Sequence, residues 1–152
     1  MINNLVQRHP AVAHDAGRRW AVNVLALAGA ALLVWSSVIH LQLWSDGYRS
    51  ISVIGPLFLI QGIGGIALAL SVAVFRRAVL LAAGAVLLAG TAAGLLVSTA
   101  FGLFGFQESL AVPYATSSLV VEFTGAAVLA VATATVLAGR RRPVQSISGP
   151  RS

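Results

Sequence analysis

Two apolar runs meet at a pair of arginines in residues 51–104, ISVIGPLFLIQGIGGIALALSVAVFRRAVLLAAGAVLLAGTAAGLLVSTAFGLF. Each run is longer than the ~20 residues that a helix needs to cross a hydrocarbon core of ~30 Å. Because lipid offers no hydrogen bonds to an open backbone, such runs are expected to be helical. The stretch therefore predicts two neighbouring transmembrane helices, residues 51–75 and 78–104, joined by a short link at Arg76 and Arg77.

The same pattern recurs on either side of this pair. One apolar run covers residues 20–43 and another covers residues 116–139, and arginines flank both runs. We therefore predict an all-α fold, an antiparallel bundle of four transmembrane helices within residues 20–139, with short tails at residues 1–19 and 140–152. A cleaved signal peptide is the rival interpretation of the first run, but that run is longer than the apolar region of a signal peptide.

Composition points to the same class of protein. Of the 152 residues, 58% are hydrophobic and 9% are charged, and the mean hydropathy is +0.90. Soluble domains carry about 25% charged residues, so lipid must be the solvent for much of this chain. The sequence contains no cysteine, which excludes disulfides, thiol catalysis and thiolate metal sites.

All ten basic residues are arginines, and all but Arg49 fall on one side of the predicted bundle. The positive-inside rule assigns that side to the cytoplasm, so we expect a multi-pass protein of the cell membrane with both termini cytoplasmic. The pI near 11.6 then reflects topology and attraction to anionic lipid, and a nucleic-acid partner has little support. The arginines of the cytoplasmic side are Arg8, Arg18, Arg19, Arg76, Arg77, Arg140, Arg141, Arg142 and Arg151.

Small residues recur at every fourth position in two of the predicted helices. Residues four apart share one helix face, and membrane helices associate through such small residues. We interpret the two strips as packing surfaces inside the bundle, and the interface of a homo-oligomer is the alternative. The strips are Gly90, Gly94, Ser98 and Gly102 in one helix and Ala126, Ala130, Ala134 and Ala138 in another.

Four candidate site residues, His40, Arg49, Gln61 and Glu122, are expected near the outer end of the bundle. At ~1.5 Å per residue, Glu122 lies ~5 Å and Gln61 ~7–8 Å inside the outer boundary. An ionisable side chain in a membrane segment costs roughly 2.5–3.5 kcal/mol on insertion scales and marks a functional site by default. The sequence therefore predicts an outward-facing polar pocket.

Each candidate has a functional and a structural interpretation. Glu122 could bind a proton, a cation or a basic substrate, or it could form a structural ion pair with Arg49 or His40. His40 could relay a proton or bind a ligand, or it could form an interfacial hydrogen bond. Gln61 is expected to make an interhelical hydrogen bond, with ligand contact as the alternative. We predict no catalytic residue and no cofactor. We also predict no metal site, since zinc needs three or four ligands and the plausible outer ones are limited to His40, Glu122 and Asp46.

Several short motifs support the topology. They are HLQLW at residues 40–44, GYR at 47–49, IGPLFL at 54–59, GLFGF at 102–106, and PY at 113–114 leading to Glu122. With them the chain resembles a group of small four-helix membrane proteins of high-GC bacteria that carry no assigned activity. The resemblance covers the chain from the first to the fourth predicted helix, and it implies the topology and no chemistry.

These observations favour a non-enzymatic integral membrane protein, either an accessory or scaffolding subunit or a small binding module. Its expected partners are the lipid bilayer and either other membrane subunits or further copies of the chain. The alternative is a proton- or cation-coupled carrier that uses Glu122, with His40 as its relay. A membrane enzyme that acts on a lipid-like substrate through the same two residues is the less favoured third interpretation.

Overall fold

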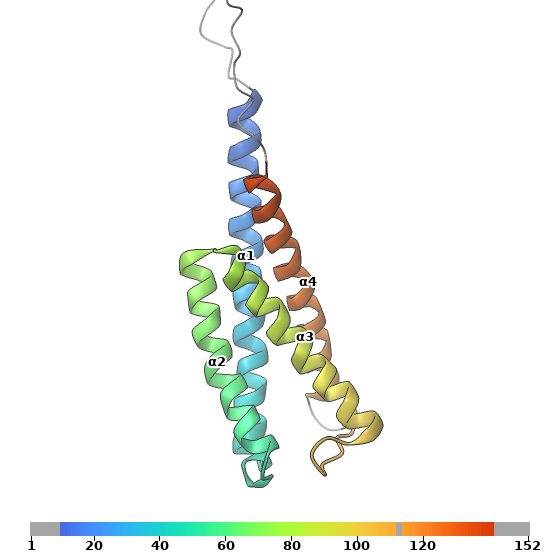
Figure 1. Cartoon of the computed structure of the whole chain (residues 1–152). Coiled ribbons are helices and arrows are strands. Elements are labelled where there is room, and N and C mark those ends of the chain that lie inside the picture. Colours follow the sequence, from blue (N-terminus) through green and yellow to red (C-terminus); the bar gives the residue numbers. More distant parts are fainter. Residues whose placement is uncertain (1–9, 112–113, 142–152) are drawn as a thin grey trace, which may run out of the picture.

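The computed structural model describes residues 10–111 and 114–141, and it places side chains from residue 15 onward. Within these residues the fold is all-helical, as predicted, and it contains no strand beyond an isolated bridge between Leu103 and Phe106. The elements are the helices α1 (Pro10–Ser45), α2 (Ile54–Phe75), α3 (Ala78–Phe101) and α4 (Ala115–Arg140) and the short 3-10 helix η1 (Tyr48–Ser50), shown in Figure 1.

All four helices are long and apolar enough to cross a membrane, which confirms this part of the prediction. The candidate spans within the described residues are Asp15–Ser45, Ile54–Phe75, Ala78–Phe101 and Ala115–Arg140. Large apolar side chains lie exposed on every helix, among them Trp35, Ile60, Val86 and Phe123. Apolar surface on every side of a bundle is expected where the surroundings are acyl chains, and the four spans suggest a multi-pass membrane protein.

The helix bounds differ from the predicted ones mainly in α1. This helix begins at Pro10, so much of the predicted tail at residues 1–19 is helical. Proline is favourable in the first turn, where its missing N–H has no intrahelical partner, and an ion pair of 3.5 Å between Asp15 and Arg18 supports the next turns. α3 is shorter than predicted and stops at Phe101, because Gly102, with φ 77°, turns the backbone out of the helix.

Where α1 contacts α2 and α4, residue numbers rise along one helix and fall along the other. Gly62 of α2 lies against Leu41 of α1, and Gly65 lies against Ser37, so rising numbers in one helix meet falling numbers in the other. The same order relates α1 to α4, because Gly29 lies against Leu129 while Ser36 reaches Glu122. These close approaches rely on glycine, since a methyl group at Gly62, Gly65 or Gly29 would overlap its neighbour.

The packing surfaces inside the bundle are not the two predicted strips. In α3 and α4 the buried rows contain Gly84 and Leu88 on one helix and Gly125 and Leu129 on the other. Leu129 fills the space beside Gly84, and Leu88 fills the space beside Gly125. A leucine seated against a glycine gains more dispersion contacts than two flat strips of small residues would.

The predicted strips have other surroundings in the structure. Open space lies beside Gly90 and Gly94, and Ala130 and Ala134 are exposed. The members that are neither open nor exposed are Ser98, which is buried, and Gly102 and Ala126, which are half-buried. Ala138 is exposed as well. Most members of the two strips therefore do not pack inside the bundle, and their alternative role as the interface of a homo-oligomer stays a prediction.

The bundle is tight at one end and open at the other. α2 packs mainly on α1, and α3 packs mainly on α4, while α2 and α3 diverge from the link at Arg76 and Arg77 (Figure 1). A cluster of fully buried apolar side chains that includes Leu33, Leu81 and Leu129 forms the core. η1 and residues 102–111 lie at the opposite end from the link, which we call the loop end, and the buried polar side chains gather there.

Candidate functional site

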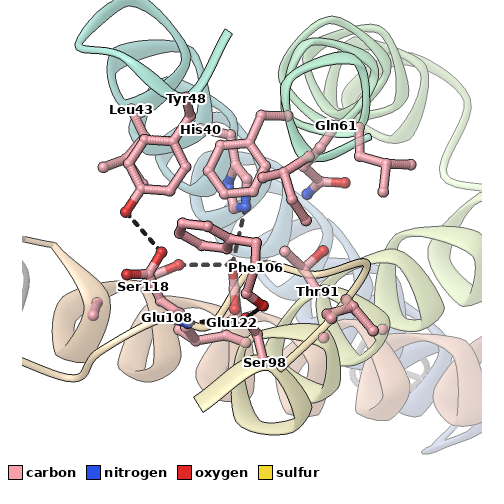
Figure 2. Close-up of a pocket in the computed structure, with 18 of the residues that line it drawn as sticks. His40, Leu43, Tyr48, Gln61, Thr91, Ser98, Phe106, Glu108, Ser118 and Glu122 are labelled. Atoms are coloured by element: carbon pink, nitrogen blue, oxygen red, sulfur yellow. Dashed lines mark hydrogen bonds and ion pairs between the residues drawn. The ribbon is translucent and has the colours of Figure 1, made fainter. Parts of the chain in front are cut away.

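A cavity of about 410 Å³ lies at the loop end, and all four helices contribute to its lining. Its volume falls in the ~300–1,000 Å³ range of small-molecule sites. Leu57 and Phe58 of α2 and Val86 and Leu95 of α3 give it apolar walls. Figure 2 shows that polar side chains from α1, α2 and α4 point toward one another in its interior. The cavity thus joins an apolar compartment to a small polar one.

Among the polar residues that line the cavity, Glu122 is the most deeply buried, with 0% of its surface exposed. Its Oε1 accepts hydrogen bonds from the hydroxyl of Ser118, at 2.8 Å, and from that of Ser36, at 3.3 Å. Its Oε2 is buried without a hydrogen-bond partner among the described residues. The site therefore contains one carboxyl oxygen that is held by two hydroxyls and one that is buried without a partner beside the cavity.

His40 approaches the same carboxyl from α1. Its Nδ1 lies 2.8 Å from the backbone carbonyl of Ser36, and because a carbonyl can only accept, Nδ1 carries the hydrogen. Nε2 is then the nitrogen that faces Glu122, at 4.0 Å from Oε1. The ring also stands edge-on to Phe58, with 4.9 Å between centroids. One further proton, shared between Nε2 and the carboxyl, gives the pair no net charge. The pair is then either a histidinium with a carboxylate or a neutral imidazole with a carboxylic acid.

Local helix periodicity explains why these side chains meet. Ser36 and His40 lie one turn apart on α1, and Ser118 and Glu122 lie one turn apart on α4. Side chains at i and i+4 share a face, so each helix presents a hydroxyl and an ionisable group together. The two pairs face each other where α1 packs on α4, which brings Ser36 to Glu122. The role of Ser118 was not predicted, although its spacing from Glu122 is a signal in the sequence.

Gln61 lines the cavity from α2 and is buried. Its Nε2, which offers two hydrogens, has no hydrogen-bond partner among the described residues. The predicted interhelical hydrogen bond is therefore not made by this atom. Gln61 shares its buried face with Gly65 and Ala69. Its amide therefore lies inside the bundle, with its two hydrogens unpaired among the described residues.

Arg49 does not join the cluster. It lies in η1, is exposed and is not part of the cavity lining. The ion pairs among the described residues are Asp15–Arg18 and the His40–Glu122 approach. Of the two predicted structural partners of Glu122, the structure thus places His40 nearby and Arg49 elsewhere. A short 3-10 turn directs the arginine side chain to the surface.

A hydrogen bond links the two loops that cover one end of the cavity. The hydroxyl of Tyr48 donates to Glu108 Oε2 at 2.7 Å (Figure 2). The Tyr48 ring stacks on Phe58, with 5.1 Å between centroids, and stands edge-on to Phe106 at 5.6 Å. Burial, together with the bond and charge of Glu108, raises the pKa of Tyr48 above its usual value, which keeps the phenol a donor. Sequence reasoning did not identify this link as part of the site.

Gly55 positions the loop that carries Tyr48. A Cβ at this position would stand 2.7 Å from the backbone oxygen of Arg49 and 2.9 Å from that of Tyr48. We expect Gly55→Ala to displace η1 and to lower the free energy of unfolding by about 1–3 kcal/mol, the usual cost of overpacking. Thermal unfolding in detergent measures this loss. Gly64→Ala is the control, because open space surrounds Gly64; equal stability of the two variants would contradict the prediction.

The side chains at the site that carry a formal charge are acidic. Glu108 and Glu122 line the cavity, and no arginine does so in the described part of the chain. No group of three or more metal-ligating side chains gathers within the described residues. The arrangement can hold a proton or attract a cationic group, since two carboxyls, a histidine and an amide surround a partly apolar space.

None of three comparisons gives a match. The chain matches no protein-family model, no curated protein and no solved structure. The resemblance to small four-helix membrane proteins of high-GC bacteria therefore stays a prediction. Function must be argued from the site itself, because a helical bundle is compatible with many functions.

Proposed function

We propose that this chain is a non-enzymatic protein of the cell membrane that binds a small molecule in its loop-end cavity, as a binding module or as an accessory subunit. In this proposal the four helices cross the bilayer as an antiparallel bundle with both termini in the cytoplasm. The one-sided distribution of arginines supports the orientation. The opposite numbering of facing helices supports the antiparallel arrangement. The cavity then opens in the outer half of the membrane.

The observation that carries a binding role is the state of Glu122. Its carboxyl is fully buried, one of its oxygens has no partner among the described residues, and it borders a cavity of about 410 Å³. A buried polar atom without a partner typically costs about 1–3 kcal/mol, and a purely structural role would not explain such a cost. A ligand that reaches Oε2 supplies the missing partner.

Filling the cavity tests the proposed function. Gly94 lines the cavity and has open space beside it, so Gly94→Leu places a side chain in the space of the ligand while Glu122 itself is unchanged. Protein released from native-lipid discs in a mass spectrometer is expected to retain one bound molecule as wild type and to lose it, by about tenfold in occupancy, in the variant.

The matched control is Gly64→Leu, an equal change at an open position of α2 outside the cavity. It should retain the molecule as wild type does. A wild-type protein without any bound molecule, or a Gly94→Leu variant that keeps it, contradicts the proposed function.

A second candidate function has one specific observation in its favour. His40 Nε2 and Glu122 Oε1 are 4.0 Å apart and both side chains are buried. A pair that holds one proton in a dry place is the kind of group that coupled carriers use. In this proposal Glu122 releases and takes up the proton, His40 relays it, and the cavity holds the exchanged cation.

A further inference from the structure

The cavity is open on its side, between α2 and α3. Val86 lines it and yet is 72% exposed, and Leu57 on the facing helix lines it and is 44% exposed. Gly90, which also lines it, has no heavy atom within 4 Å of the position of a Cβ. The two helices diverge along this side (Figure 1). In a bilayer this opening faces acyl chains, so a molecule dissolved in the membrane has a direct route inward.

The end of the cavity is covered, in contrast to its side. The Tyr48–Glu108 hydrogen bond crosses it, and Phe58 and Phe106 pack against the tyrosine ring. The backbone N–H of Glu108 donates to the hydroxyl of Ser98 at 3.2 Å, which ties this cover to α3. The side between α2 and α3 is therefore the more open route into the cavity.

The polar interior selects for a cationic head group. Glu108 and Glu122 are acidic, His40 presents a nitrogen that accepts when neutral, and no arginine of the described chain lines the cavity. Phosphate and carboxylate heads would meet two carboxyls with no basic side chain to offset the repulsion. An ammonium instead donates hydrogen bonds to Glu122 Oε2, and the nearby aromatic rings favour a positive charge.

We propose that the cavity binds a single-chain amphiphile with an ammonium head, which enters from the bilayer between α2 and α3 and pairs with Glu122. This inference rests on the proposed binding function and adds to it the ligand class and the route. The apolar walls formed by Leu57, Val86 and Leu95 hold the chain. Gln61 lines the same cavity, and its buried Nε2, which has no partner among the described residues, would donate to an acceptor on the head, such as a hydroxyl oxygen.

Head-group comparison tests the inference. The full chain in discs of zwitterionic lipid, which has no net charge, is titrated with dodecylamine, dodecanol and dodecanoate. The binding of each probe to discs without protein is subtracted. Wild type is expected to bind the amine about tenfold or more tightly than the alcohol and the carboxylate. In Glu122→Gln this preference should vanish, whereas Asp46→Asn, the same change at an exposed carboxyl outside the cavity, should keep it.

Failure of the inference is distinguishable from failure of the proposed function. Equal binding of amine and alcohol by wild type, or a preference that survives in Glu122→Gln, overturns the ammonium assignment. If both probes then bind and Gly94→Leu releases both, the binding function stands without it. If no probe binds above empty discs, the inference is wrong, and the molecule retained by wild type in the mass spectrometer decides the proposed function separately. The wild-type comparison of probes requires no variant, so poor folding of Glu122→Gln does not prevent the test.

Discussion

Glu122→Gln is expected to abolish proton-linked flux if the protein is a coupled carrier, while its amount in the membrane stays unchanged. The amide is nearly isosteric with the carboxyl, and its oxygen can still accept from Ser118 and Ser36. What the amide loses is the ability to release a proton. The variant therefore separates a chemical role of Glu122 from a packing role, because the neighbouring helix contacts are retained.

The measurement uses sealed lipid vesicles that contain a pH-sensitive dye and the purified full chain. A gradient of Na⁺ or of tetraethylammonium is imposed, and proton movement is followed. Asp46→Asn serves as the control, since this exposed carboxyl lies outside the cavity. Flux that persists in Glu122→Gln removes the carrier function, and so does a wild-type protein without flux. In both cases the binding function is untouched.

Leu129→Ala is expected to cause the largest loss of stability. The leucine is fully buried in α4, and it fills the space beside Gly29 of α1 and Gly84 of α3. Truncation leaves a void between three helices that glycine cannot fill, and such changes cost about 2–5 kcal/mol. Unfolding equilibria in detergent or bicelles measure the difference.

Leu137→Ala provides the matched control on the same helix. This leucine is 40% exposed, so its truncation removes fewer contacts within the bundle than truncation of the fully buried Leu129. We expect a change within about 0.5 kcal/mol, as for ordinary surface positions. Equal losses at the two positions would show that the contact of Leu129 with the two glycines does not hold the bundle together.

Much of the fold could be predicted because the bilayer limits the alternatives. An uncharged apolar run of sufficient length has to be helical in lipid, so four runs predict four helices. The approach of His40 to Glu122 could also be anticipated, since both residues lie near the same end of their helices and each is one turn from a serine. Position along a helix and the period of the helix were sufficient for that part of the site.

The choice of packing face could not be predicted from small residues alone. α3 contains a row with Gly84 and Leu88 and a row with Gly90 and Gly94, and the second row has the smaller side chains. What distinguishes the rows is the position of Leu129 on the partner helix, which fits beside Gly84. That complementarity is a property of two helices together, so it is not visible in either sequence segment.

The closure of the cavity was also out of reach. Tyr48 and Glu108 are 60 positions apart in the chain. The first lies in the single turn of η1 and the second in the irregular segment that follows α3. Gly105, with φ 78°, and Phe104, with φ 53°, turn the second loop back on itself. No helical or strand period describes such segments, so the sequence contained no geometric rule that would pair them.

The length of α1 has a mechanical consequence. Its 36 residues span ~54 Å at ~1.5 Å each, whereas a whole bilayer measures ~40–45 Å including head groups. The side chain of Arg18 lies against Gly139 near the end of α4, so the turns before Arg18 project beyond the other helices as a rod (Figure 1). Any tilt of the bundle swings the tip of this rod sideways. If the bundle spans a membrane, an event at the loop end that changes its tilt would thereby displace the tip of α1 in the water on the opposite side.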